Sequence, residues 1–297
     1  MAPPAGRHDG RASAAHAKPL VQERTVMSHP YWGLTESPFS SPGNRFFFRT
    51  ATNEEALARL QFLCEHRRRV GLLVGPPGAG KTRLLAIFAR LARQAGRQVA
   101  STSALGVGAA ELLSEVARAF GVSLPPTASV AAAWRTIDDF LAASRYQNLD
   151  SVLLVDDVDE CDPAAAQQLA RLSQTTSAAG GRLSLVLAGR NRLLGALGSR
   201  LLDLVELRID LELWEAAETK NFLREALVAA GLTKEVFAPA AVARLHELSG
   251  GSPRRVMQLA ELCLVAGAAI GSSAIDPQTV ESVHFELGVT GTATALA

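Results

Sequence analysis

A glycine-rich segment that ends in lysine and threonine is the part of this sequence best suited to chemistry. Residues 75–82 read Gly-Pro-Pro-Gly-Ala-Gly-Lys-Thr and match the spacing GxxxxGK[ST] at every fixed position. Glycines let the backbone curl so that successive N–H groups face an anion, and the lysine supplies a cation for the outer phosphates of a nucleotide. The threonine hydroxyl is a ligand for Mg²⁺. The pattern predicts a phosphate-binding loop (P-loop) for Mg-ATP, formed by Gly75, Pro76, Pro77, Gly78, Ala79, Gly80, Lys81, Thr82 and the following Arg83.

Two adjacent carboxylates follow an apolar run later in the chain. Residues 152–155 read Val-Leu-Leu-Val, which is typical of a buried strand, and Asp156 and Asp157 come next. We expect Asp156 to hold Mg²⁺ through water and Asp157 to polarise the water that attacks the terminal phosphate. Aspartates also end strands simply because they favour turns, which is the alternative for this pair. The P-loop upstream favours the functional interpretation.

The elements that must position these residues alternate between strands and helices. Apolar runs predict strands at 70–75, 98–101, 151–155, 183–188 and 204–211, with helices at about 53–67, 80–95, 108–120, 128–146, 162–178 and 190–199. Beyond residue 212 only helical patterns remain, at 214–230, 239–248, 253–269 and 277–287. The sequence therefore predicts an α/β fold: a P-loop NTPase with a five-stranded parallel sheet, followed by a small all-helical lid domain. We expect disordered tails at 1–28 and 289–297, the α/β domain at 29–212 and the lid at 213–288.

Composition restricts the environment and the partners. The chain has 297 residues, 48% of them hydrophobic, and its 30 basic and 29 acidic residues give a net charge of +1, which does not indicate DNA binding. The three cysteines, Cys64, Cys161 and Cys263, lie far apart and are expected to be reduced packing residues. No apolar run is long enough for a membrane span, and residues 1–28 lack the apolar core of a signal peptide. We therefore expect a cytoplasmic protein.

With these motifs, residues 30–288 resemble an AAA+ ATPase. The subgroup that the chain resembles most is the ExeA type of general secretion pathway ATPases, whose members open with an aromatic-Gly-Leu…Pro-Phe segment, here Tyr-Trp-Gly-Leu-Thr-Glu-Ser-Pro-Phe at 31–39. Similar cores occur in transposition regulators of the MuB and TniB kind. The resemblance implies that this opening segment wraps the adenine, with contacts from Leu34 and Phe39. Sealing of the hydrophobic core is the alternative for Trp32 and Phe39.

The same resemblance implies three further site residues. Residues 185–192 are similar to the family's fourth strand with its sensor-1 residue, which we assign to Asn191, although the subgroup more often has a polar residue one position earlier, at Arg190. Arg200 resembles the arginine finger that one subunit aims at its neighbour's γ-phosphate. Arg254, in Gly-Ser-Pro-Arg at 251–254, resembles the sensor-2 arginine that starts a lid helix. Helix capping is the alternative for Asn191, and an ordinary surface position is the alternative for Arg200.

The expected function follows from the motifs and the resemblance. We expect an ATPase, with ATP and Mg²⁺ as ligands, whose cycle drives assembly into a homo-oligomer and remodels or recruits an unidentified protein partner. The family usually has glutamate where this chain has Asp157, so hydrolysis is expected to be slow. The alternative is an ATP-dependent DNA-binding adaptor, for which the arginine run at 67–69 is the only compact basic segment. Three charges of this kind more often form a solvated helix end than a DNA contact.

Overall fold

The computed structural model describes residues 29–39, 46–125, 127–175, 182–191, 195 and 197–293. The expected N-terminal tail at 1–28 lies outside these residues. The α/β part contains helices α2 (Ala51–Glu65), α3 (Lys81–Gln94), α4 (Ala109–Ala119), α5 (Val130–Tyr146), α6 (Pro163–Thr175) and α7 (Ser199–Leu202). Its strands are β1 (Val70–Val74), β2 (Gln98–Ser103), β3 (Ser151–Asp156), β4 (Leu183–Gly189) and β5 (Leu207–Asp210).

The strands form one parallel sheet in the order β2-β3-β4-β1-β5. Every residue of the three central strands is buried, whereas the edge strands β2 and β5 each have one buried residue among half-buried and exposed ones. Successive side chains of a strand point to opposite faces, so a strand that is apolar throughout needs cover on both sides. The predicted five-stranded parallel sheet is confirmed.

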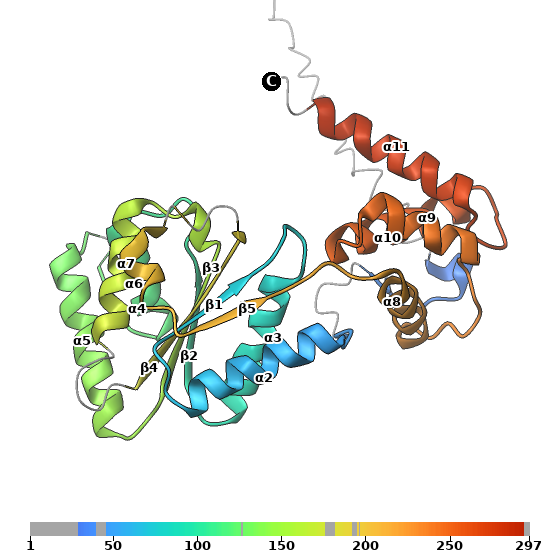
Figure 1. The fold of residues 1–297 in the computed structure, drawn as a ribbon. Helices are drawn as coiled ribbons and strands as arrows, with labels where there is room; N and C mark the ends of the chain where they lie inside the picture. Colours follow the sequence, from blue (N-terminus) through green and yellow to red (C-terminus); the bar gives the residue numbers. More distant parts are fainter. Residues whose placement is uncertain are drawn as a thin grey trace, which may run out of the picture.

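Helices cover both faces of this sheet (Figure 1). Leu72 and Val74 of β1 point into a core with α4, α5, α6 and α7, whereas Leu73 points into a second core with α2 and α3. The order of the strands then decides what meets at the carboxyl edge. Because β4 lies between β3 and β1, the ends of these three strands are neighbours, which is where ligands bind in sheets of this type.

A lid of four helices follows the sheet: α8 (Ala216–Ala229), α9 (Pro239–Ser249), α10 (Pro253–Ala269) and α11 (Pro277–Ala293). It has its own hydrophobic core and is joined to the sheet by the extended segment after β5 (Figure 1). Helix α11 continues to Ala293, beyond the boundary that we expected at residue 288. A glycine such as Gly288 costs a helix only about 1 kcal/mol, so it does not have to end one.

The opening segment belongs to the lid core. We expected residues 29–39 to be part of the α/β domain, but Trp32, Leu34 and Phe39 are buried among the lid residues. The indole Nε1 of Trp32 donates a hydrogen bond to the carbonyl of Leu264 in α10, at 2.8 Å. Burial of large apolar side chains, which stabilises by roughly 1.5–3 kcal/mol each, explains why this segment returns to a domain far along the chain.

Candidate functional site

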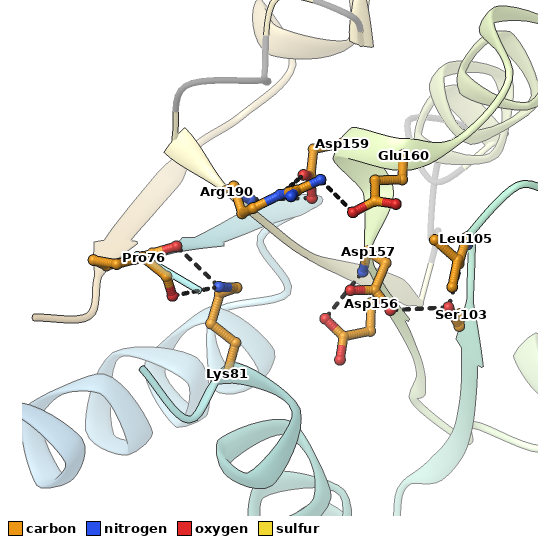
Figure 2. Close-up of polar contacts among 10 residues, drawn as sticks. Pro76, Lys81, Ser103, Leu105, Asp156, Asp157, Asp159, Glu160 and Arg190 are labelled. Carbon is orange, nitrogen blue, oxygen red and sulfur yellow. Dashed lines mark hydrogen bonds and ion pairs between the residues drawn. The ribbon is translucent and has the colours of Figure 1, made fainter. Parts of the chain in front are cut away.

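The P-loop connects β1 to the first turn of α3. Gly78 and Gly80 adopt φ angles of 79° and 99°, which side chains rarely allow, and no side chain caps the helix at Gly80. The first N–H groups of α3 therefore remain available to an anion, and the helix dipole favours negative charge there. The Lys81 Nζ donates to the carbonyls of Gly75 and Pro76, at 2.9 and 3.0 Å (Figure 2). Burial lowers the pKa of Lys81, and the neighbouring carboxylates of Asp156 and Asp159 oppose that shift.

Thr82 and Asp156 meet beside the P-loop. The Thr82 hydroxyl donates to Oδ2 of Asp156 at 2.5 Å, and the backbone N–H of Asp157 donates to the other carboxylate oxygen at 3.0 Å. Burial raises the pKa of the Asp156 carboxyl, while the bond from Thr82 lowers it. Among the described residues, no group of three or more His, Cys, Asp or Glu side chains could hold a metal ion. This pair of oxygen ligands fits Mg²⁺, which takes its remaining ligands from phosphates and water.

The Asp157 side chain points toward β2, the outer strand next to β3. Its backbone is left-handed, with a φ angle of 53°, and its carboxylate accepts a hydrogen bond from the Ser103 hydroxyl at 3.1 Å (Figure 2). Ser103 is the last residue of β2 and pairs in register with Asp156. Ser103 could not be singled out from the sequence, because a single serine at a strand end belongs to no motif.

A carboxylate–arginine cluster connects the segment after β3 to the end of β4. The Arg190 Nε donates to Oδ2 of Asp159 at 2.6 Å, and the backbone N–H of Arg190 donates to Oδ1 at 3.0 Å. The guanidinium also pairs with Glu160 through Nη2 (Figure 2). We assigned no role to Arg190 or Asp159 from the sequence. The sequence did contain a feature that could have indicated this cluster. Arg190 follows a buried strand directly, and two further carboxylates, Asp159 and Glu160, come soon after Asp157.

The residue that we assigned to sensor 1 has a different partner. Asn191 is exposed, and its Oδ1 accepts a hydrogen bond from Nη2 of Arg208 on β5, at 3.0 Å. Arg190, one position earlier, is the residue that contacts the carboxylates beside the P-loop. Arg200, our candidate arginine finger, is exposed in the short helix α7.

The lid contacts the P-loop directly. The backbone N–H of Arg254, in the first turn of α10, donates to the carbonyl of Gly78 at 3.3 Å. A pocket of about 290 Å³ lies next to this contact, between the α/β part and the lid. Half of its lining residues are aromatic. Phe39 is among them, whereas Leu34 packs within the lid core. The lining residues are Phe39, Phe46, Phe47, Phe48, Asn53, Ala79, Gly80, Arg83, Trp214, Phe222, Pro253 and Met257.

Three consecutive phenylalanines supply much of this pocket and were not singled out from the sequence. Phe48 packs edge-to-face against Trp214 with ring centroids 5.4 Å apart, and Arg83 donates to the Phe46 carbonyl at 3.3 Å. An apolar pocket that is lined by aromatic rings and lies beside a phosphate-binding loop can hold a nucleotide base. The run of phenylalanines was a usable signal, because such a run needs an apolar environment on more than one side.

The arginine run at 67–69 has carboxylate partners. Arg67 pairs with Asp150 at 3.3 Å, and Arg69 pairs with Glu206 at 2.6 Å, with Arg68 at 3.9 Å from the same glutamate. These pairs offset much of the positive charge that a DNA contact would require. Among the described residues, no helix has both the length and the apolar character needed to cross a membrane.

The fold and this site are similar to those of P-loop proteins of the AAA+ class. Residues 64–197 match the family model described as an AAA domain. The chain is 29% identical over 264 residues to the general secretion pathway protein A of Aeromonas hydrophila, an alignment that covers 86% of this chain and 48% of that protein. The chain thus spans about half the length of this relative. Both the AAA domain and the similarity to the general secretion pathway group were predicted from the sequence, and both are confirmed.

Solved structures show the same fold at low identity. Cdc6p from Pyrobaculum aerophilum superposes with a TM-score of 0.68 at 19% identity, over 84% of this chain and 70% of that chain. The ORC1 protein of Aeropyrum pernix, solved in complex with DNA, gives a TM-score of 0.65 at 21% identity, over 83% and 68% of the two chains. These similarities establish the AAA+ fold, with its helical lid.

Proposed function

We propose that this protein binds and hydrolyses Mg-ATP between the P-loop and the lid. The observation that carries the proposal is the convergence of Lys81, Thr82 and Asp156 at one point of the sheet edge, beside an uncapped helix N-terminus. In this arrangement the backbone and Lys81 bind the phosphates, while Thr82 and Asp156 hold Mg²⁺. Mg²⁺ held by Thr82 and Asp156 would neutralise charge on the outer phosphates.

The aromatic pocket is the proposed site of the adenine. Phe39 and Trp214 supply apolar walls, and Arg83 and Asn53 lie at the same pocket. Of the two adenine contacts that the family resemblance implied, we retain Phe39; Leu34 supports the lid core behind it. Arg254, exposed at the start of α10, is the lid residue that we propose faces the nucleotide phosphates.

Asp157 is the proposed general base, in a position that is unfavourable for catalysis. Its hydrogen bond with Ser103 directs the carboxylate toward β2, and its side chain is one methylene shorter than the glutamate usual in this family. Both features agree with slow hydrolysis, since a displacement of about 1 Å can cost roughly a hundredfold in rate.

We expect Asp157→Glu to raise the hydrolysis rate about tenfold, because the longer side chain restores the reach of the carboxylate to the attacking water. Asp157→Asn should reduce the residual rate further and leave Mg-ATP binding unchanged. Phosphate release under single-turnover conditions measures both effects. A rate that is insensitive to both substitutions would remove Asp157 from the mechanism.

The nucleotide cycle is proposed to control assembly of copies of this chain, and through assembly to remodel or recruit a partner protein. Arg200 supports the proposal because it is exposed on the short helix α7, where it is accessible to a neighbouring subunit. An arginine suits this role since its planar guanidinium stays charged and binds phosphate oxygens through paired donors.

Light scattering in ADP and in a non-hydrolysable ATP analogue tests this proposal. We expect a larger assembly with the analogue, and we expect Arg200→Ala to bind nucleotide normally while losing at least about tenfold in assembly-dependent hydrolysis. Arg224→Ala, an exposed arginine on the lid helix α8, is the matched control. Equal masses in both nucleotides would contradict the assembly proposal without affecting the binding site.

A further inference from the structure

A second cavity, of about 400 Å³, lies in the lid between α8 and α9, and we call it the α8–α9 groove. It shares no lining residue with the aromatic pocket beside the P-loop. Its base is apolar and includes Leu223, Leu227 and Val236. Val228, in the last turn of α8, is 53% exposed at the same groove. Exposed apolar surface that is also concave marks interaction sites on proteins.

The base of the groove is held in place by the lid core and by a short backbone pairing. Leu227 and Val236 belong to the lid core. Phe237 and Ile275 form a parallel β-bridge. The N–H of Ile275 donates to the Val236 carbonyl at 2.7 Å, and the N–H of Ala238 donates to the Ile275 carbonyl at 3.0 Å. The segment between α8 and α9 is therefore fixed, and a preformed groove costs a partner less to bind than a flexible one.

The rim of the groove carries positive charge without carboxylate partners. Lys220 and Arg224 lie about one turn apart on α8, Lys234 lies in the segment before α9, and all three side chains are exposed. Within the part of the chain that the structure describes, none of these three cations forms an ion pair. Glu235 is the acidic residue at the groove, so three basic residues and one acidic residue give the lining a net charge of +2. An acidic partner would meet complementary charge here.

The groove is long enough for a helix. Exposed residues that line it recur every four positions along α8, at Ala216, Lys220, Arg224 and Val228. They extend over about three turns, roughly 18 Å, which matches a partner helix of about 13 residues. An amphipathic helix presents apolar side chains along one face to such a base, and acidic side chains at the margins of that face would meet the rim.

Other occupants fit this groove less well. The phosphates of DNA would match the charge of the rim, but the DNA backbone presents phosphates and sugars rather than an apolar face. Residues 1–28 contain four basic and two acidic residues, so their net charge has the same sign as the rim. Residues 289–297 carry no charged side chain. The charge and the apolar base together favour an acidic segment of another protein.

We propose that the α8–α9 groove docks an acidic amphipathic helix of a partner protein. Apolar side chains of that helix cover the groove base, and its carboxylates face Lys220, Arg224 and Lys234. This inference rests on the partner recruitment in the proposed function and states which surface and which chemistry recruit the partner. The groove and the nucleotide pocket can fail separately, because they share no lining residue.

Fluorescence anisotropy with two labelled peptides, measured without nucleotide, tests the proposal. Both peptides are stapled helices of about 13 residues with leucine on one face, and the margins of that face carry glutamate in one peptide and lysine in the other. The wild-type protein should bind the acidic peptide at least about tenfold more tightly. Lys220→Glu should weaken binding of the acidic peptide about five- to tenfold and strengthen binding of the basic one. The matched control, Arg90→Glu at an exposed arginine of α3, should change neither affinity.

Val228→Gln tests the apolar part of the groove. It should weaken binding of both peptides about threefold, because it removes apolar surface from the wall. Val228 is exposed and glutamine favours a helix at least as well as valine, so this variant folds.

Four results would overturn the inference: no binding of the acidic peptide, equal affinities for the two peptides, unchanged affinities in Lys220→Glu, or unchanged affinities in Val228→Gln. Loss of assembly in Lys220→Glu would assign the groove to a second copy of this chain, and loss of duplex DNA binding would assign it to nucleic acid. Either result also overturns the inference. A protein that binds the acidic peptide but not Mg-ATP would instead refute the nucleotide site and support the groove.

Discussion

Lys81→Ala should lower the affinity for Mg-ATP at least about tenfold, equivalent to roughly 1.4 kcal/mol of binding free energy. Lys81 is the only lysine at the P-loop, and its ammonium already contacts two loop carbonyls, so phosphate oxygens can take over these bonds with little rearrangement. Burial lowers the pKa of this lysine, and the approach of phosphate charge favours its protonated form. Isothermal titration calorimetry with Mg-ATP measures this loss of affinity.

Lys234→Ala is the matched control for this experiment. Lys234 is an exposed lysine of the lid and lines a different groove, between α8 and α9. It should bind Mg-ATP as the wild type does. If a folded Lys81→Ala protein retained wild-type affinity, the nucleotide would bind elsewhere, and the assignment of residues 75–82 would be wrong.

Gly251→Ala should destabilise the lid by about 3 kcal/mol, because the residue cannot adopt its conformation without strain or a clash. Gly251 has a φ angle of 69°, and a Cβ atom there would lie 2.3 Å from the backbone carbonyl oxygen of Trp214. The N–H of Trp214 also donates to the Gly251 carbonyl at 2.8 Å, so the two backbones are held in contact. This contact sets the start of α10, which carries Arg254.

Gly250→Ala provides the comparison for this glycine. Gly250 is also left-handed, with a φ angle of 59°, but no atom lies within 4 Å of the place where its Cβ would be. Alanine there should cost only about 1 kcal/mol. Chemical denaturation of the two variants measures the difference in the free energy of unfolding. Equal destabilisation would show that the close approach to Trp214 does not matter.

The sequence predicted the features that depend on residues close together in the chain, and it did not predict those that depend on the order of the strands. The P-loop and Asp156 follow fixed spacings next to apolar strands, so their positions and their shared sheet edge could be read from the chain. The pair of Asp159 and Arg190 could not, because it depends on β4 lying next to both β3 and β1, and strand order is a tertiary property. The position of Ser103 beside Asp157 depends in the same way on β2 pairing with β3.

The opening segment shows a second limit. Its motif at 31–39 suggested contact with the nucleotide, and Phe39 does line the aromatic pocket. Trp32 instead packs against α10, which lies 232 residues further along the chain at Leu264. Apolar residues fit either a core or a base-binding pocket, and only the folded arrangement distinguishes these environments. The sequence therefore located the phosphate site more sharply than the base site.

Hydrogen exchange measured by mass spectrometry, with and without a non-hydrolysable Mg-ATP analogue, tests the central claim most directly. If ATP binds between the P-loop and the lid, peptides that cover residues 75–84 and 251–258 should both gain protection, because the nucleotide orders the loop and the start of α10 together. Peptides from the α8–α9 groove, around residues 232–237, should not change. Protection confined to that groove, with none at the P-loop, would contradict the account.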